Sequence, residues 1–467
     1  MSRHRHAPAT TSGPSPRVAF RTLGCRLNQV DTEGLRAALA ERFAVTAVPW
    51  DSAADVYVIN SCTVTSRAEQ ECRRLARQVR RREPLARVVV VGCYAQTQPQ
   101  VLARLPEVDA VVGAAVRDAV EEWFPAVARG DDKVVSSRQY LRDEPFHAPM
   151  IASFAGRSRA FVKVQDGCDL RCSYCAIWQA RGPARSRAAD EVLAQMANLR
   201  ASGYRELVLV GVHLGSYGRD RRERDGLTGL LRAAVAAHPD LRLRLGSIHP
   251  DEVTGDLLAL MADHPQVRPH LHISLQSGDD AVLGRMRRPY RGAQARSAVE
   301  RAARRLPGCG IGADLIVGFP GETDAEFAAT LAMVGDLPFT YLHVFRYSPR
   351  PGTVAAALPG RVHAELTTER SRVLRALGRR KRRAFARTLV GTWREAVVES
   401  VSGDGRQRLA TTDNYVSVSV PPDAGTEGGL VRLCPQRLRG ERLETTAVAT
   451  LVGGRMSGAA AAALEAR

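Results

Sequence analysis

The feature that most constrains the fold is an alternation of short apolar, β-rich runs with longer helical stretches. The first such runs are Arg17–Leu23, Asp55–Asn60 and Arg87–Val91, and helical stretches separate them. This alternation is typical of parallel sheets, because a parallel crossover needs a connection about as long as a helix. We therefore predict an N-terminal α/β domain with a parallel sheet over residues 17–127, followed by a polar linker at 128–150.

A second series of strand-like runs follows the linker, again with helical stretches between most of its members. The runs are Phe161–Gln165, Glu206–Gly211, Leu241–Gly246, His270–Leu275, Gly312–Val317 and Tyr341–Phe345. Repeated βα units close into barrels, and six of them predict a partial (βα)6 barrel over residues 151–388.

The last part of the chain has a different pattern. Residues 389–453 alternate in short strand-like runs with Gly and Pro turns, which predicts a small β-barrel. The polar ends at 1–16 and 454–467 are predicted to be disordered tails. The fold class is thus α/β, with a small β domain at the C-terminus.

The charge of the chain favours a polyanionic partner such as nucleic acid, since the net charge is +18 and the pI is near 10.2. Only three lysines are present, so GC-rich coding is an alternative cause of the arginine excess. No run approaches the roughly 20 apolar residues of a membrane span, and the N-terminus lacks the apolar region of a signal peptide. We expect a cytoplasmic protein without a membrane partner, whose cysteines serve metal or catalytic roles.

Cys168, Cys172 and Cys175 form a CxxxCxxC motif directly after a predicted strand. Three thiolates in so short a run suit an iron–sulfur cluster, which usually takes four. One iron would stay open, as a catalytic metal requires. A zinc site, or a cluster completed by a distant cysteine, is the alternative.

Cys25, Cys62 and Cys93 each lie just beyond the carboxyl end of a predicted parallel strand. Ligands bind at that edge of open α/β sheets, so these three thiolates can converge on a second cluster. Three separate loop thiols are the alternative. The remaining cysteines have no partner at ligand spacing, and we interpret them as structural: Cys72, Cys309 and Cys434.

CxxxCxxC resembles the signature of radical S-adenosylmethionine (SAM) enzymes, and with the three N-terminal cysteines the chain resembles the methylthiotransferases over about residues 17–450. The matching stretches are TLGCRLNQVDTE (22–33), ADVYVINSCTVT (54–65), GCYAQ (92–96), VKVQDGCDLRCSYC (162–175), GVHLGSYG (211–218), LHISLQSG (271–278), DLIVGFPGET (314–323) and FRYSPRPGT (345–353).

Three of these stretches, TLGCRLNQ, GVHLGSYG and FRYSPRPGT, resemble the branch of the family that acts on threonylcarbamoyladenosine in tRNA. The C-terminal strands are similar to the TRAM domain, a small RNA-binding barrel. The stretch CAIWQARG departs from the more usual CIIPYARG at Trp178 and Gln179. This departure affects the expected details of the pocket near the motif, not the cluster.

The resemblance implies two [4Fe–4S] clusters, one on each cysteine set, and two SAM molecules per turnover. One SAM is cleaved to a radical, the other methylates a sulfur on the N-terminal cluster, and the methylthio group goes to carbon 2 of the adenosine next to the anticodon. The implied partners are tRNA, a sulfur source and a reductant protein such as flavodoxin or ferredoxin. Alternatives are another tRNA adenosine, an aspartate of a ribosomal protein, or an RNA-binding iron–sulfur protein without activity.

Further candidates follow from position in the matched stretches. The residues with a possible cofactor contact are Tyr174, Gln276, Ser277 and Gly318, with a packed aromatic and a simple turn as alternatives for the first and the last. His272 is expected to point into the barrel, and a structural role is favoured for His213. The candidates for RNA binding are Arg379, Arg380, Lys381, Arg382, Arg383 and Tyr415; a solvated helix face is the alternative for the basic run.

Overall fold

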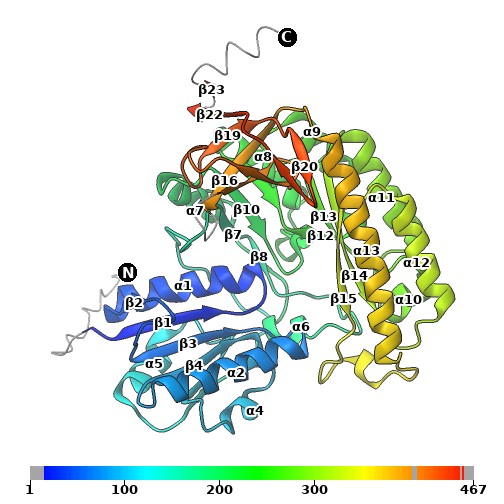
Figure 1. The fold of residues 1–467 in the computed structure, drawn as a ribbon. Helices are drawn as coiled ribbons and strands as arrows, with labels where there is room; N and C mark the ends of the chain where they lie inside the picture. Colours follow the sequence, from blue (N-terminus) through cyan, green and yellow to red (C-terminus); the bar gives the residue numbers. More distant parts are fainter. Residues whose placement is uncertain (1–14, 402–406, 453–454, 457–467) are drawn as a thin grey trace. The chain divides into compact units, whose positions relative to one another are not determined.

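The computed structural model describes residues 15–401, 407–452 and 455–456 (Figure 1). The chain forms two compact units. The first, called the N-terminal unit, contains the chain up to Ile151 together with Asp166–Arg185 and Ser348–Ala356. The second, called the barrel unit, contains the rest. Most of the predicted tails at 1–16 and 454–467 lie outside the described residues.

The N-terminal unit is built on a parallel sheet of six strands in the order β2-β1-β3-β4-β5-β6. The strands are β1 (Arg17–Thr22), β2 (Thr46–Val48), β3 (Val56–Ser61), β4 (Arg87–Gly92), β5 (Ala110–Gly113) and β6 (Val134–Ser136). Every residue of β3 is buried, as expected for a central strand covered on both faces. The predicted parallel sheet is confirmed.

Helices cover both faces of this sheet. They are α1 (Arg26–Phe43), α2 (Ser66–Arg82), α3 (Cys93–Thr97), α4 (Pro99–Ala103) and α5 (Val120–Arg129). On one face, Leu35 of α1 and Trp123 of α5 pack with the strands in one apolar cluster. On the other, Leu75 of α2 and Leu102 of α4 belong to a second cluster. The loops that carry the cysteines lie at the carboxyl ends of the strands.

Two details of the N-terminal unit concern its connections. The helical stretch after β4 is divided into α3 and α4 at Gln98, because the residue before a proline is disfavoured in the helical conformation. The stretch 128–150, predicted as a linker, contains the edge strand β6. Its pairing with β5 supplies backbone hydrogen bonds that a polar linker would leave to water.

The barrel unit contains the second series of parallel strands. They are β7 (Ala160–Lys163), β10 (Glu206–Val210), β11 (Arg242–Leu245), β12 (Ser247–Ile248), β13 (His270–Gln276), β14 (Gly310–Val317) and β15 (Tyr341–Arg346). β7, β10 and β11 form a three-stranded sheet, and β12 to β15 form a four-stranded sheet. β11 pairs with β10 and β12 pairs with β13, so the segment from β11 to β12 passes from the first sheet to the second. The predicted α/β architecture of this part is confirmed.

Helices follow these strands along the chain, and they appear around the sheet in Figure 1. They are α7 (Ala189–Ala201), α8 (Gly226–Ala237), α9 (Gly255–Asp263), α10 (Asp280–Arg285), α11 (Gly292–Arg305), α12 (Asp324–Asp336) and the long α13 (Ala364–Thr388). α12 begins with a capping box, in which Thr323 and Glu326 satisfy each other's backbone N–H groups.

The C-terminal part of the chain forms one eight-stranded sheet in the order β20-β21-β18-β17-β16-β19-β22-β23. The strands are β16 (Arg394–Val401), β17 (Arg408–Thr412), β18 (Ser417–Val420), β19 (Leu430–Leu433), β20 (Arg437–Arg439), β21 (Arg442–Glu444), β22 (Val448–Val452) and β23 (Arg455–Met456). The strand-rich C-terminus is confirmed, whereas a closed barrel of the TRAM type stays a prediction.

A buried ion network joins this sheet to the barrel strands. Glu206 of β10 is fully buried and accepts from Arg244 at 2.8 Å and from Arg268 at 3.0 Å. Arg244 also donates to the backbone oxygens of Thr412 and Asp413. The carboxylate therefore fixes two arginines that hold the C-terminal sheet against the barrel.

Candidate functional site

The three N-terminal cysteines lie at the carboxyl edge of the parallel sheet, as predicted from their position after strands. Cys25 precedes α1, Cys62 follows β3 and Cys93 begins α3 directly after β4. Cys62 and Cys93 are buried, and Cys25 is exposed. The edge of the sheet thus carries two protected thiols and one open to solvent.

Close packing brings these loops together. A Cβ added to Gly24 would lie 2.6 Å from Cβ and 2.7 Å from Sγ of Cys62, so only glycine fits there. Gly24 also has a φ of +93°, a conformation that residues with a side chain rarely adopt. The loop that carries Cys25 therefore lies directly against Cys62.

Asn28, in the first turn of α1, ties the same loops by hydrogen bonds. Its side-chain amide donates to the backbone oxygens of Leu23 at 2.8 Å and Ser61 at 3.0 Å. Its side-chain oxygen accepts from the thiol of Cys93 at 3.8 Å. One buried amide thus bonds to all three cysteine loops.

The thiols also affect one another electrostatically. Burial raises the pKa of Cys62 to about 12, and Cys93 and Cys25 add to this effect. Burial likewise raises the pKa of Cys93, while the nearby Arg181 opposes the increase. Three thiols close enough to interact suit a bound positive centre, which removes their protons.

The CxxxCxxC motif belongs to the same compact unit, although it follows a barrel strand in sequence. Cys172 is buried, and Cys168 and Cys175 are half-buried. The motif begins after Gly167, where a Cβ would overlap the backbone oxygen of Pro183. It ends at the short helix α6 (Ile177–Arg181). Both cysteine sets are therefore held by one folded unit.

Arg181, the last residue of α6, links the two sets. Its guanidinium lies 2.6 Å from Asp31 and donates to Asn28 at 2.7 Å, and on the motif side it lies 3.0 Å from Asp166. Although burial opposes its charge, Asp31, Cys93 and Asp166 raise the pKa of Arg181 above its ordinary value. A single buried cation thus bonds both to the helix that follows Cys25 and to the segment that carries Cys168.

No single sequence pattern indicates a role for this network. Asn28 and Asp31 lie within TLGCRLNQVDTE and Arg181 within CAIWQARG, so the matched stretches contained the signal. A buried arginine paired with two acids cannot be recognised from either stretch alone, because its partners lie 150 and 15 residues away.

The third piece of the unit, Ser348–Ala356, braces the motif. Gln179 donates to the backbone oxygen of Gly352 at 3.0 Å, and Ala355 donates to that of Ser173 at 2.8 Å. Arg350 forms a buried ion pair with Glu69 of α2 at 2.7 Å. The unusual Gln179 thereby has a defined contact, and Trp178 lies under the guanidinium of Arg171.

The four residues with a predicted cofactor contact are placed as follows. Tyr174 is half-buried within the motif. Gln276 ends β13 with a φ of +67°, and the Ser277 hydroxyl bonds to Thr330 at 3.0 Å. At Gly318 the close neighbour is Thr367 of α13, against which a Cβ would clash. Cofactor binding by these residues stays a prediction.

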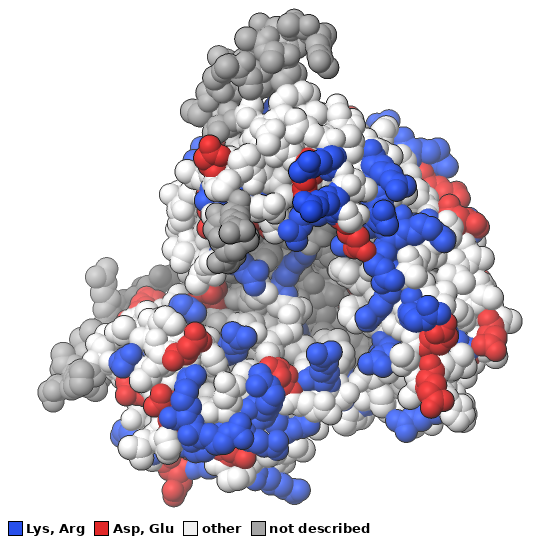
Figure 2. Space-filling view, viewed as in Figure 1, with Lys and Arg blue, Asp and Glu red and all other residues white. Residues whose placement is uncertain are grey.

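The predicted basic run is divided by the helical twist of α13. Lys381 turns toward the end of α12, where it donates to the backbone oxygens of Gly335 and Leu337. Arg379 and Arg382 instead line a surface cavity of about 460 Å³ together with Arg375. Figure 2 shows basic side chains following this helix. Arg380 and Arg383 are exposed as well.

Tyr415, the predicted aromatic contact for RNA, is half-buried in the barrel unit. Its ring centroid lies 4.4 Å from that of His270 and 5.7 Å from that of Tyr341. His272 contacts Asp314 at 2.9 Å and the Tyr341 hydroxyl, both on neighbouring strands, and its expected position inside the barrel stays a prediction. RNA contact by Tyr415 and the basic run stays a prediction.

Two family models match the chain. Residues 17–113 match "Uncharacterized protein family UPF0004", and residues 162–334 match "Radical SAM superfamily". These ranges contain the first and second cysteine sets respectively. The described part of the chain contains no helix with the length and apolar character of a membrane span.

Curated relatives match most of the chain. The threonylcarbamoyladenosine tRNA methylthiotransferase MtaB of Aquifex aeolicus is 36% identical, with 86% of this chain and 96% of the relative covered. The tRNA-2-methylthio-N(6)-dimethylallyladenosine synthase of Parafrankia sp. is 37% identical, with coverage of 86% and 80%. The ribosomal protein uS12 methylthiotransferase RimO of Roseiflexus castenholzii is 35% identical, with coverage of 84% and 86%.

Among solved structures, the radical SAM methyltransferase TsrM of Kitasatospora setae has a similar fold. The TM-score is 0.56 at 17% identity, and the match covers 73% of this chain and 77% of TsrM. That structure contains cobalamin and a [4Fe–4S] cluster. At this identity the likeness concerns the fold.

Proposed function

The chain belongs to the radical SAM methylthiotransferases, and we propose that its substrate is N(6)-threonylcarbamoyladenosine next to the anticodon of tRNA, methylthiolated at carbon 2. The observation that carries the proposal is the convergence of Cys25, Cys62 and Cys93 in the same unit as the CxxxCxxC motif. The substrate assignment is supported by relatives named for this nucleoside, which match over most of the chain.

The residues of both cysteine sets fit iron–sulfur clusters. Each set offers three thiols and leaves one iron of a [4Fe–4S] cluster without a protein thiolate. At the sheet edge, Cys62 and Cys93 are buried next to the Cys25 loop, so the three thiols are close enough to bind one cluster, which would displace their protons. When bound, the clusters supply one-electron cleavage of SAM and a site for the transferred sulfur.

The chain's own residues hold and shield these sites. Gly24 lets the Cys25 loop approach Cys62. Asn28 holds the backbone oxygens of Leu23 and Ser61, which precede the Cys25 and Cys62 loops. Arg181 places a positive charge beside Cys93 and Asp31. A cationic group near a cluster favours its reduced, more negative form, since charge and hydrogen bonds set cluster potentials.

Helix α13 supplies the surface proposed for tRNA. Arg375, Arg379 and Arg382 lie on one face at spacings of four and three residues, so they can contact successive phosphates. Such contacts position RNA without reading its sequence. We further propose that a flavodoxin- or ferredoxin-like protein donates the electrons and that a separate donor renews the sulfur.

The test is mass spectrometry of tRNA nucleosides from cells with and without the gene. Without it, methylthio-threonylcarbamoyladenosine should disappear and its precursor should accumulate. The wild-type gene and a Cys72→Ala variant should restore the product, because Cys72 is buried in α2 away from the cysteine edge. A Cys62→Ala variant should not restore it.

An unchanged tRNA profile in a strain without a redundant enzyme would exclude this substrate. Disappearance of methylthio-dimethylallyladenosine would indicate the other tRNA branch. A change confined to ribosomal protein uS12 would indicate a protein substrate, as for the relative from Roseiflexus castenholzii.

A further inference from the structure

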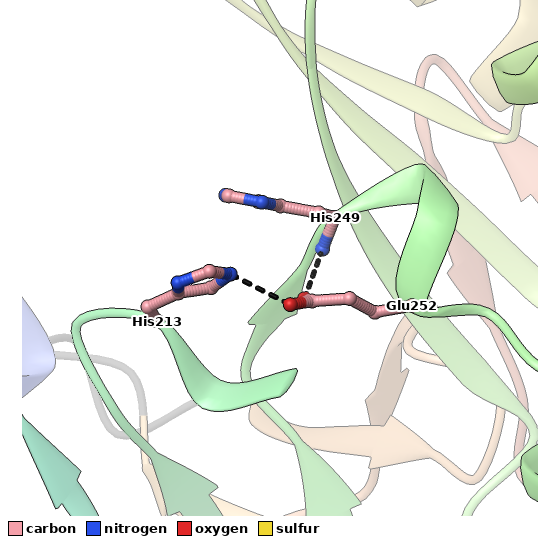
Figure 3. Close-up of side chains that lie close together, drawn as sticks. All are labelled: His213, His249 and Glu252. Atoms are coloured by element: carbon pink, nitrogen blue, oxygen red, sulfur yellow. Dashed lines mark hydrogen bonds and ion pairs between the residues drawn. The ribbon is translucent and has the colours of Figure 1, made fainter. Parts of the chain in front are cut away.

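A group of polar side chains in the barrel unit lies apart from the cysteines. His213 follows β10, His249 directly follows β12, and Glu252 lies in the turn after it. Figure 3 shows the three side chains close together. They lie at the carboxyl ends of neighbouring parallel strands, the face at which barrels bind their substrates.

Glu252 is the fixed centre of the group. Its Oε1 lies 2.6 Å from Nε2 of His213, and its Oε2 accepts from the backbone N–H of His249 at 3.1 Å. Gly215 lies so close to this carboxylate that a Cβ would clash with it. The loop 211–218, which carries the GVHLGSYG stretch, therefore packs directly on Glu252.

His249 is the unusual member. Its ring lies 4.2 Å from that of His213, centroid to centroid, and only 9% of the residue is exposed. Its Nδ1 is buried and has no hydrogen-bond partner among the described residues. A buried polar atom without a partner is destabilising, and a bound ligand that hydrogen-bonds to it removes this cost.

Besides the Glu252 carboxylate, which is already paired with His213 and with Arg219 at 3.4 Å, positively charged side chains surround His249. Burial lowers its pKa far below the ordinary value, and Arg288, His213 and Arg219 lower it further. The Arg288 guanidinium is oriented by Tyr290, whose hydroxyl accepts from Nε at 2.9 Å. The Tyr290 ring in turn lies 6.1 Å from that of His249.

These features favour an anion over a metal ion. Two imidazoles and a carboxylate with ligand atoms within 4.8 Å are a common donor set for zinc. However, zinc bonds of about 2.0–2.2 Å hold ligand atoms roughly 3.3 Å apart, whereas His213 and Glu252 are already hydrogen-bonded at 2.6 Å. The Glu252 charge is already paired with His213 and Arg219, and the remaining cation, Arg288, would repel a dication and attract a carboxylate.

We propose that His249 and Arg288 form a subsite for an amino-acid carboxylate, that of the threonylcarbamoyl group on the substrate base. The inference rests on the proposed function, because this group is what distinguishes the proposed substrate from other adenosines. The neutral imidazole donates one hydrogen bond through Nδ1, and the guanidinium supplies charge and a second donor. His213 and Glu252 act as positioning residues that hold the loop and the backbone of His249.

The experiment measures binding of synthetic anticodon stem–loops to the reconstituted holoenzyme by fluorescence anisotropy. The RNAs differ only at the base: threonylcarbamoyladenosine, its carboxamide analogue, and unmodified adenosine. The wild type should bind the carboxylate RNA about tenfold more tightly than the carboxamide RNA, as expected for a charge-assisted hydrogen bond. His249→Ala and Arg288→Gln should bring this ratio close to one.

His264→Ala is the matched control, because this histidine follows α9 at the opposite end of the strands and should keep the wild-type ratio. Unchanged affinity for the unmodified RNA would show that each variant is folded. A wild-type ratio near one, or an unchanged ratio in His249→Ala, would overturn the proposal. So would a weaker affinity for SAM alone in His249→Ala with the RNA ratio intact, since the carboxylate would then belong to SAM.

The outcomes separate this subsite from the proposed function. A wild type that methylthiolates threonylcarbamoyladenosine but shows no preference for the carboxylate leaves the function standing without the subsite. A wild type that prefers the carboxylate but modifies no tRNA leaves the subsite without the function.

Discussion

The guanidinium of Arg181 lies 2.6 Å from the carboxylate of Asp31, and this buried pair connects residues 150 positions apart in the sequence. Asp31 lies on the helix that begins at the Cys25 loop, whereas Arg181 ends the segment that begins at Cys168. The pair therefore fixes the two cysteine sets within one unit.

Replacing Arg181 by Gln should destabilise the N-terminal unit. Removal of one partner from a buried ion pair costs about 3–5 kcal/mol when the other charge is left unpaired. Asp31 keeps a second buried contact with Arg117 at 3.0 Å, so we expect the cost to lie at the lower end of this range. Calorimetry of the apo-protein should show a lower unfolding temperature, and reconstitution should yield less bound iron. The control is Arg171→Gln in the same segment, whose side chain lies on Trp178 and should contribute no more than about 1 kcal/mol. Equal destabilisation of both variants would contradict this role for Arg181.

Gly24→Ala should impair the cluster at the sheet edge, because the new Cβ would lie within 2.7 Å of the Cys62 thiol. Gly203→Ala is a matched control, since Gly203 has a similar φ of +96° but no heavy atom within 4 Å of its Cβ position. Both variants bear the backbone strain of a positive φ. In a background with Ala at Cys168, Cys172 and Cys175, only Gly24→Ala should lower the iron content. A lower iron content in both would mean that strain alone is responsible.

The stability of the barrel unit should fall at acidic pH because of Glu206. Burial opposes its charge, yet Arg244 and Arg268 lower the pKa of Glu206 from 4.5 to about 2. The group therefore contributes stability above pH 4.5 that is lost as the pH falls toward 2. Urea unfolding should show a smaller free energy at pH 3 than at pH 6, with a weaker pH dependence in Glu206→Gln. An identical pH dependence in both proteins would contradict the assignment.

Replacing both Arg379 and Arg382 by Ala should weaken tRNA binding. The slope of log affinity against log salt should fall by about 1 for each phosphate that the variant no longer neutralises. Lys381→Ala should keep the wild-type slope, because its ammonium group binds the carbonyls at the end of α12. Titrations at several salt concentrations measure this slope. A slope that changes only in Lys381→Ala would place the RNA on another face of α13.

The sequence predicted the features that depend on local patterns. Apolar runs such as Arg87–Val91 became buried strands because only a strand covered on both faces is apolar throughout. The positions of Cys25, Cys62 and Cys93 followed from the same runs, since each cysteine lies just beyond one. The convergence of these loops is a consequence of parallel pairing.

Features that depend on distant partners could not be predicted in this way. The side on which Lys381 lies is set by the end of α12, and the ring of Tyr415 is packed by residues of β13 and β15. The pairing of His213 with Glu252 requires two loops from different strands to meet. Periodicity describes one element at a time and contains no information about these partners.

The N-terminal unit is closed by Ser348–Ala356, which is synthesised long after its first 151 residues. At about 5–20 residues per second, a ribosome needs roughly 10–40 s to cover that interval. Throughout this time the CxxxCxxC segment lacks its contact with Ala355, and Glu69 of the nascent N-terminal unit lacks its ion pair with Arg350. Loading of iron into the motif is therefore expected to be a late, post-translational event, and a ribosome stalled before residue 348 would expose an unfinished cysteine site to oxidation.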